Sequence, residues 1–270
     1  MKILLNNNDL NEALYNVSDL GFVPTMGSLH KGHISLIKKS LKQSKKTIVS
    51  IFVNPTQFNN KNDYKNYPKN SQKDLSILKK LKIDFLYMPK KNDVYNFKRK
   101  SLIRLNKKDK VLCARFRKGH FEGVIDVMER LTGIIKPQKI YMGEKDFQQV
   151  YLVKKYLQKK FKTKIISCKT IRNNDKLAFS SRNSLLSKAE LNKAGRISKE
   201  MILFKKKIKK NKNIKKLLIY KKNQLIKTFN IKIDYFELRN TINFQNSNKI
   251  KNSKLFIAYY INKVRLIDNF

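Results

Sequence analysis

The tetrapeptide His30-Lys31-Gly32-His33 holds two of the three histidines of the chain. A short apolar run and a glycine turn precede it, and apolar residues return at helical spacing from Ile34. This pattern predicts a strand, a tight turn and a helix that begins with two imidazoles. A helix N-terminus carries a partial charge of about +0.5 and suits a phosphate. The segment is therefore a candidate phosphate site, and the simpler alternative is that a histidine only caps the helix.

Two other polar segments could also bind a nucleotide. In Gly143-Glu144-Lys145-Asp146 the glycine permits close backbone approach, the aspartate can accept from ribose hydroxyls, and the lysine can neutralise phosphate. Ser180-Ser181-Arg182-Asn183 combines hydroxyls with a guanidinium, which could hold the β- and γ-phosphates as pyrophosphate leaves. Taken alone, each segment also fits a plain capping or turn role.

A fourth candidate follows the run at residues 47–53, which is nearly continuous in apolar and β-branched residues. Such a run predicts a strand buried on both faces, and Pro55 ends it. Ligands of open α/β sheets bind outside the carboxyl ends of the strands. Asn54 and Gln57 are therefore candidate site residues by position as well as by chemistry.

The elements that must position these residues alternate between strand and helix. This alternation predicts an α/β fold, with a doubly wound parallel sheet (Rossmann-like) in an N-terminal domain at residues 1–174. A different texture follows, and it predicts a smaller α+β C-terminal lid domain at 175–270. Residues 59–70 are polar and lysine-rich and predict a loop. The predicted strands lie at 3–5, 22–23, 47–53, 84–87, 102–105, 139–143, 164–167, 231–238, 254–260 and 264–267, and the predicted helices at 9–15, 33–45, 71–81, 121–135, 146–161, 188–210 and 214–229.

Composition limits the class of protein. The chain has 270 residues, of which 41% are hydrophobic, and no apolar run approaches the ~20 residues that a membrane span needs. The first residues carry too short an apolar stretch for a signal peptide. The two cysteines are far apart, so neither a zinc site nor a disulfide framework is expected. We expect a soluble, cytoplasmic protein.

The formal net charge is +43. A charge of this size could attract nucleic acid or an anionic membrane. The lysines are spread along the whole chain among many asparagines and isoleucines, however, and no basic stretch concentrates the aromatic residues that stack on single strands. We therefore favour compositional drift at tolerant surface positions over a dedicated polyanion site, and expect no nucleic-acid partner and no membrane partner.

Six motifs occur in one order along the chain: V-P-T-M-G-S-L-H-K-G-H, S-I-F-V-N-P-T-Q-F, G-H-F-E-G-V, Y-M-G-E-K-D-F-Q-Q-V, L-A-F-S-S-R-N and R-L-I-D-N. Together they resemble the pantothenate synthetase (pantoate–β-alanine ligase) family over essentially the full length. The H-x-G-H turn is shared more widely, by nucleotidylyl transferases and class I aminoacyl-tRNA synthetases.

The resemblance implies condensation of pantoate with β-alanine at the expense of ATP, with Mg²⁺. The pantoate carboxylate attacks the α-phosphorus to form pantoyl adenylate, and the amine of β-alanine then displaces AMP. The enzyme would act by positioning and by charge neutralisation. The resemblance also implies a homodimer formed through the N-terminal domain.

The resemblance assigns site residues by motif match. His33 is the expected general acid, and His30, Lys145 and Arg182 are the other expected catalytic residues. The expected ATP-binding residues are Met26, Gly27, Ser28, Leu29, His30, Lys31, Gly32, His33, Gly143, Glu144, Lys145, Asp146, Ile171, Phe179, Ser180, Ser181 and Arg182. Those expected to bind pantoate or β-alanine are Gln57, Gln149, Thr25, Met26, Asn54 and Arg117, and Asp74 is the candidate near Mg²⁺.

The chain departs from the family pattern at three places. Leu112-Cys113-Ala114 stands where L-E-G is usual, Glu122 stands where arginine is common, and Lys176 replaces a glycine. A turn with φ > 0 would be strained at Lys176.

Two competing functions share some of these features. Another adenylyl-transferring enzyme would keep H-x-G-H but would lack N-P-T-Q-F and G-E-K-D-F-Q-Q. A basic nucleic-acid-binding protein that has lost catalysis would show eroded ATP motifs, and these motifs are intact.

Overall fold

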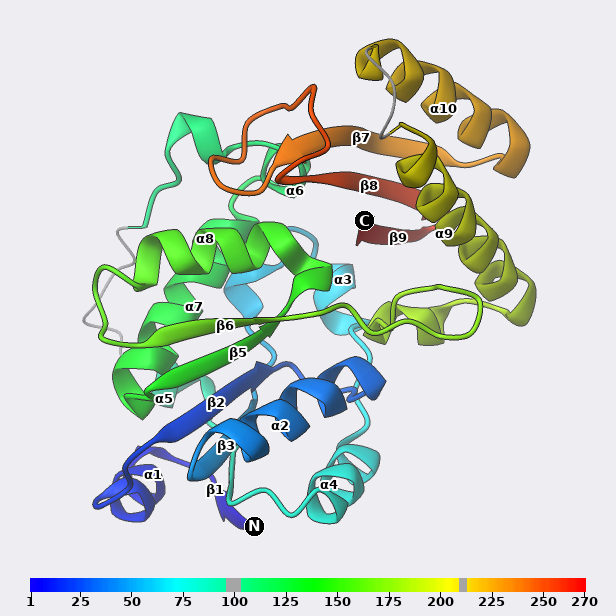
Figure 1. Ribbon diagram of the computed structural model, residues 1–270. Helices are drawn as coiled ribbons and strands as arrows, with labels where there is room; N and C mark the ends of the chain where they lie inside the picture. The colour runs from blue at the N-terminus through cyan, green and yellow to red at the C-terminus, as the bar shows by residue number, and fades with distance from the viewer. Residues whose placement is uncertain (96–102, 209–212) are drawn as a thin grey trace. The chain divides into compact units, whose positions relative to one another are not determined.

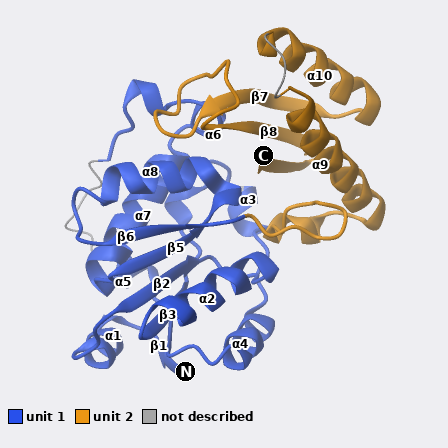
Figure 2. Ribbon diagram, in the orientation of Figure 1, with its two compact units in different colours: residues 1–169 blue, residues 170–270 orange. Residues whose placement is uncertain are grey.

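The computed structural model describes residues 1–95, 103–208 and 213–270 (Figure 1). The chain divides into two compact units, Met1–Lys169 and Thr170–Phe270 (Figure 2). The sequence predicted this boundary between residues 174 and 175. In the structure it lies five residues earlier, and residues 170–174 belong to the second unit. The strand predicted at 102–105 begins outside the described residues, and residues 103–105 form no strand.

The first unit is built on a six-stranded sheet in the order β1-β4-β3-β2-β5-β6. All its strand pairs are parallel, which confirms the predicted doubly wound α/β class. The central strand β2 pairs with β3 on one side and with β5 on the other, so the strand order reverses there. The strands are β1 (Lys2–Leu4), β2 (Leu20–Thr25), β3 (Lys46–Ile51), β4 (Phe85–Tyr87), β5 (Lys139–Gly143) and β6 (Lys164–Cys168).

Helices cover both faces of this sheet (Figure 1). On one face, α2 (Lys31–Gln43) and α4 (Ser71–Lys80) pack Ile37 and Leu78 against Val23 and Val49 of the strands, all fully buried. On the other face lie α7 (His120–Ile135) and α8 (Phe147–Leu157). Burial on both faces explains why the strands read as apolar runs.

Short helices occupy much of the remaining chain of this unit. They are α1 (Asn7–Leu14), η1 (Pro55–Gln57), α3 (Lys61–Lys65), α5 (Lys91–Val94), η2 (Lys107–Asp109), α6 (Cys113–Phe116) and η3 (Glu144–Asp146). The loop predicted at 59–70 was wrong at α3. Asn60 caps that helix by accepting from the Asn62 N–H at 2.7 Å, and Tyr64 packs edge-on against Phe58. A five-residue helix has too few turns to show apolar periodicity.

The second unit is α+β. It holds η4 (Ser181–Leu185), α9 (Lys188–Ile208) and α10 (Ile214–Phe229), followed by an antiparallel sheet of β7 (Lys232–Asn240), β8 (Ser253–Ile261) and β9 (Val264–Asn269). Apolar side chains from both helices and all three strands form one core, which includes Met201, Leu225 and Ile257. Arg172 fixes the segment before η4 through a bidentate ion pair with Asp268 of β9, at 2.7 and 2.8 Å.

Lys176 adopts φ = +67° in the turn between Arg172 and Ala178. This confirms that the turn requires the left-handed region, where a side chain with a Cβ is strained by about 1–2 kcal/mol. Four hydrogen bonds hold the turn. Lys176 N–H donates to Asn173 O, and Asn173 N–H donates to Leu177 O. Arg172 donates to Lys176 O, and Leu177 N–H donates to Asn173 Oδ1.

No helix in the described part of the chain is both long enough and apolar enough to cross a membrane.

Candidate active site

The two histidines of the H-x-G-H segment stack at the N-terminus of α2, with ring centroids 4.0 Å apart. His30 is the N-cap residue, and its Nδ1 accepts the Gly32 N–H at 3.1 Å. His33 Nδ1 accepts the His30 N–H in return, at 3.4 Å. The capping role that the sequence left open is therefore present, and it occupies one nitrogen of each ring.

These contacts fix the protonation state of both rings. A backbone N–H can only donate, so each Nδ1 must be unprotonated, and the proton of each neutral imidazole resides on Nε2. Burial lowers the pKa of His30 to about 4 and that of His33 to about 3, and the positive charge of Lys145 adds to both shifts. At neutral pH each ring is thus a neutral Nε2–H donor, suited to a phosphate oxygen.

Asp74 shapes the loop that joins β2 to α2. Its Oδ2 accepts the Ser28 N–H and its Oδ1 accepts the Leu29 N–H, both at 2.7 Å, and the residue is 1% exposed. Gly27 adopts φ = +79° beside this carboxylate, where a Cβ would lie 3.0 Å from Oδ2. The Gly27 N–H donates to Thr25 Oγ1. Three backbone N–H groups of the loop thus donate to side chains of the protein, and these hydrogen bonds fix the conformation of the loop.

Lys145 and Asp146 belong to η3, directly after β5. Lys145 Nζ lies 3.3 Å from Asp146 Oδ1. Their charges act in opposite directions on both histidines: Lys145 lowers the pKa values of His30 and His33, and Asp146 raises them. Because β5 is the neighbour of β2 in the sheet, residues 115 positions apart in the sequence (His30 and Lys145) share one electrostatic environment.

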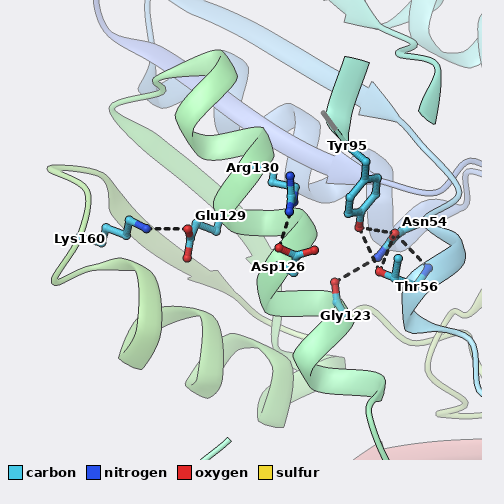
Figure 3. Close-up of polar contacts among 8 residues, drawn as sticks. All are labelled: Asn54, Thr56, Tyr95, Gly123, Asp126, Glu129, Arg130 and Lys160. Carbon is cyan, nitrogen blue, oxygen red and sulfur yellow. Dashed lines mark hydrogen bonds and ion pairs between the residues drawn. The ribbon is translucent and has the colours of Figure 1, made fainter. Parts of the chain in front are cut away.

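Asn54 and Gln57 lie in a buried turn after β3, at 1% and 9% exposure. Asn54 Nδ2 donates to Gln57 Oε1 at 3.2 Å and to Gly123 O of α7 at 3.1 Å. Gln57 Nε2 in turn donates to Met26 Sδ at 3.0 Å. Met26, Asn54 and Gln57, which the sequence assigned to one pocket, are thus in direct contact (Asn54 is labelled in Figure 3).

His120 joins Gln57 to Arg117. His120 Nδ1 lies 2.7 Å from Gln57 O, a carbonyl that only accepts, so Nδ1 carries the proton. Its Nε2 therefore accepts from Arg117 NH1, at 3.0 Å. Arg117 also pairs with Asp63 at 3.7 Å. Sequence analysis gave His120 no role of its own, although a histidine three residues after an arginine, at the start of a helix, was a usable signal.

The two neighbouring glutamines of α8 differ in environment. Gln148 is buried and ties α8 to the segment before α6, since its Oε1 accepts the Cys113 N–H at 3.0 Å and its Nε2 donates to Val111 O at 2.7 Å. Gln149, the predicted pantoate residue, is half-buried. Cys113 and Gln148 thus form a structural contact that sequence reasoning missed.

Five candidates lie in the second unit: Ile171, Phe179, Ser180, Ser181 and Arg182. Ser180 is the N-cap of η4, and its hydroxyl accepts the Arg182 N–H at 3.3 Å. Asn183 Nδ2 donates to Ala178 O. The backbone of Ile171 accepts from the Phe179 N–H at 3.1 Å, so these two candidates lie next to each other. The predicted turn role of this segment is present here as well.

The position of Asp74 near Mg²⁺ stays a prediction. Across residues 1–95, 103–208 and 213–270, no group of three or more His, Cys, Asp and Glu side chains is arranged to hold a metal ion. Both oxygens of Asp74 already accept short hydrogen bonds from backbone N–H groups.

The match to known proteins covers the whole chain. The family description "Pantoate-beta-alanine ligase" matches residues 2–270. The chain belongs to the pantoate–β-alanine ligase family. A pantothenate synthetase of Francisella philomiragia is 40% identical over 97% of this chain and 93% of its own length.

Two solved structures of this pantoate–β-alanine ligase family share the fold. The pantothenate synthetase of Thermus thermophilus has a TM-score of 0.93 and 28% identity, over 100% of this chain and 99% of that one. The Francisella tularensis pantoate–β-alanine ligase, complexed with β,γ-ATP and β-alanine, has a TM-score of 0.84 and 37% identity, over 100% and 97%. The sequence resemblance is confirmed.

Within the first unit, the geometry groups the predicted ligase residues around the ends of three adjacent strands. The histidine pair and Met26 follow β2, Asn54 and Gln57 follow β3, and Lys145 and Asp146 follow β5. This is the carboxyl edge of the sheet at the point where strand order reverses, the place where ligands bind in this class of fold.

Proposed function

We propose that this chain joins pantoate to β-alanine with ATP, through pantoyl adenylate, and releases AMP and diphosphate. The observation that carries the proposal is the pair of neutral Nε2–H donors at the start of α2 beside Lys145, together with the Gln57 amide at the end of the next strand. The histidine pair and Lys145 suit a nucleotide phosphate, and the Gln57 amide suits a small hydroxy acid.

In the proposed first step, a pantoate carboxylate oxygen attacks the α-phosphorus of ATP and the bond to the β-phosphate oxygen breaks. Negative charge grows on the phosphoryl oxygens and on the departing diphosphate. His30 and His33 donate from Nε2, and Lys145 supplies positive charge. With pKa values of about 4 and 3, the histidines act at neutral pH as hydrogen-bond donors to this charge.

In the proposed second step, the β-alanine amine attacks the acyl carbon of pantoyl adenylate, AMP leaves and the nitrogen loses a proton. Gln57, Gln149, Asn54, Thr25, Met26 and Arg117 would hold the organic substrates. Gly143 and Asp146 would bind the ribose, and Ser180, Ser181 and Arg182 the β- and γ-phosphates. Fixed orientation of the reactants is the main contribution of such residues.

Mg²⁺ belongs to the proposal as a component of the ATP substrate. Magnesium at nucleotide sites is held mainly by phosphates and water, with one or two carboxylates. Asp74, whose oxygens both accept from the loop, is proposed to act on the loop, and no step is assigned to it through the metal. A homodimer formed through the first unit is part of the same proposal and rests on family membership.

The deciding experiment is an assay of AMP release with ATP, pantoate and β-alanine, each omitted in turn. We expect AMP to form at a steady rate only when all three are present. Continuous release in the absence of either organic substrate would contradict the ligase assignment and favour another adenylyl transferase.

Two variants test the phosphate residues. His33→Asn keeps an acceptor near the position of Nδ1, and so the cap, but removes the Nε2 donor; we expect a loss of turnover of about 100-fold or more, the usual effect of one such contact. Lys145→Ala should lose turnover to a similar extent. Lys139→Ala, at the opposite end of β5, is the matched control and should keep near-normal turnover. Near-normal turnover in His33→Asn or Lys145→Ala would contradict that residue's role.

Gln57→Ala tests the acid-binding residues. We expect it to raise the KM for pantoate more than the KM for ATP, because the proposed contact is to pantoate. A larger effect on ATP would contradict this assignment.

A further inference from the structure

Half-buried Tyr95 belongs to a polar network that no step above uses. Its hydroxyl donates to Asn54 Oδ1 at 2.7 Å and lies 3.0 Å from Thr56 Oγ1 (Figure 3). Burial raises the pKa of Tyr95 to about 12, so the phenol stays protonated and remains a donor throughout the physiological range. Tyr95 directly follows α5 and lies outside every predicted site segment, between Asp74 and Arg117 in the sequence.

We propose that Tyr95 is a positioning residue, which acts through Asn54 to hold the Gln57 carboxamide with its Nε2–H₂ group toward the substrate. The proposal rests on the proposed role of Gln57 in binding pantoate. It adds a residue from outside the recognised motifs to the acid-binding half of the site.

The orientation of Asn54 follows from two backbone groups. The Thr56 N–H can only donate, and it donates to Asn54 Oδ1 at 3.3 Å. The Gly123 carbonyl can only accept, and it accepts from Asn54 Nδ2 at 3.1 Å. The amide of Asn54 therefore has one possible orientation, and its oxygen faces Tyr95.

Three donors converge on Asn54 Oδ1, and Tyr95 makes the shortest contact. Thr56 Oγ1 lies 3.1 Å from the same oxygen. A hydroxyl has one proton, so Thr56 can donate either to Asn54 or to Tyr95, but not fully to both. Either choice leaves the Tyr95 hydroxyl donating to Asn54 Oδ1 at 2.7 Å, so Tyr95 adds the shortest hydrogen bond to an amide that the two backbone groups already orient.

The orientation of Asn54 sets that of Gln57. Because Asn54 Nδ2 donates at 3.2 Å, the Gln57 atom that it meets must be the oxygen, Oε1. The donor end of Gln57 then faces Met26, whose sulfur is a weak acceptor at 3.0 Å. A hydroxyl or carboxylate oxygen of pantoate would be a stronger acceptor at this place.

The ring of Tyr95 is held independently of its hydroxyl. The guanidinium of Arg130 lies 4.8 Å from the ring centroid, and Arg130 Nε donates to Asp126 Oδ1 at 2.9 Å (Figure 3). Phe52 packs against the same ring at a centroid distance of 6.4 Å. Replacement by phenylalanine therefore removes the donor and keeps the ring contacts.

Tyr95→Phe tests the proposal, and Tyr87→Phe is the matched control. Tyr87 is a fully buried tyrosine whose hydroxyl, like that of Tyr95, donates to an asparagine oxygen: it donates to Asn7 Oδ1 of α1 at 2.5 Å. We expect Tyr95→Phe to raise the KM for pantoate about 3- to 10-fold with the KM for ATP within 2-fold, since one hydrogen bond is worth about 0.5–1.5 kcal/mol. Tyr87→Phe should lower the melting temperature without changing either KM. Equal increases in both KM values, or an unchanged KM for pantoate in Tyr95→Phe, would overturn the proposal.

A double-mutant cycle separates this proposal from the role of Gln57. Pantoate binding is measured by calorimetry on the full chain with a non-hydrolysable ATP analogue. If Tyr95 acts through Gln57, Tyr95→Phe should weaken binding in the wild-type background and have no effect in Gln57→Ala. An equal effect of Tyr95→Phe in both backgrounds overturns the proposal. Unchanged binding in Gln57→Ala alone would instead contradict the proposed function of Gln57.

Discussion

At the scale of single residues, the histidine pair caps a helix with one nitrogen of each ring and keeps the other nitrogen as a donor. Nδ1 of each ring accepts a backbone N–H at the helix start, and the proton remains on Nε2. The sequence posed capping and phosphate binding as alternatives. The geometry makes them compatible, because a histidine that caps through one nitrogen still has a donor on the other.

The lowered pKa values predict the NMR titration of these rings. With pKa values of about 4 for His30 and 3 for His33, the Cε1–H resonances of both should stay constant between pH 8 and pH 5.5. Single variants, His30→Gln and His33→Gln, would assign the signals. A midpoint near 6.5 for either ring would contradict the buried, neutral state.

The same shifts make folding stability depend on pH. An unfolded histidine has a pKa near 6.5, so below that pH the unfolded chain takes up protons that the folded rings do not. Stability from these two groups is complete above about pH 6.5 and decreases as the pH falls toward 4. Urea unfolding between pH 7.5 and 5 should show this slope, and the slope should be smaller in His33→Gln than in the wild type.

A substitution of Asp74 should show whether this residue supports the loop or binds the metal ion. Asp74→Asn places an amide N–H₂ against a backbone N–H and leaves a buried donor unsatisfied, which costs about 1–3 kcal/mol of stability. We expect a higher KM for ATP and an unchanged Mg²⁺ concentration for half-maximal rate.

Asp9→Asn is the control for this substitution, because Asp9 accepts the exposed Leu5 N–H away from the site. It should leave the KM for ATP unchanged. A selective shift in the Mg²⁺ requirement of Asp74→Asn would instead restore Asp74 as a metal ligand.

At the scale of elements, α7 supports the turn that holds Asn54 and Gln57 by close contact. A Cβ on Gly123 would lie 2.5 Å from Thr56 O and 2.9 Å from the Cα of Gln57. The helix therefore touches η1 backbone to backbone, which also brings the Gly123 carbonyl to Asn54.

Two glycine substitutions in this one helix should have opposite effects. Gly123→Ala should destabilise the chain by about 1–3 kcal/mol through overpacking and should raise the KM for pantoate. Gly133→Ala places its Cβ 3.7 Å from Phe161, an ordinary contact, and should stabilise by up to about 1 kcal/mol. Thermal melts and KM values check both. A stable Gly123→Ala with an unchanged KM for pantoate would show that the contact is not needed.

Sequence patterns predicted helices and strands well where burial imposes a regular spacing of apolar residues. The buried run of β3 and the apolar spacing of α2 are examples, and the polar residues that follow them were found as site candidates. The patterns could not predict contacts made across the chain, such as Asp74 with Ser28 or Tyr95 with Asn54, because each residue alone is an ordinary polar side chain. The helix α3 was missed because five residues are too few to show a helical period in the sequence.

At the scale of the whole molecule, the net charge of +43 should make stability sensitive to salt. Like charges repel in the compact state, and added salt shortens the Debye length from about 10 Å at 0.1 M to about 3 Å at 1 M. We expect the melting temperature to rise by several degrees between 10 mM and 500 mM NaCl. Sucrose at the same osmolarity is the control for solvent effects, and a flat response to NaCl would show that the charges are balanced locally.

The strand order has a consequence for the order of events during synthesis. Gly21 of β2 pairs with Thr47, close in the sequence, and also with Lys139, 118 residues later. The histidine pair with its loop and helix can form while the chain is still short, but Lys145 joins it only after β5 has left the ribosome. Long-range parallel pairing of this kind is slow compared with local contacts. A nascent chain thus acquires the first part of the proposed nucleotide site early, and Lys145 joins that part only when more than half of the protein has been made.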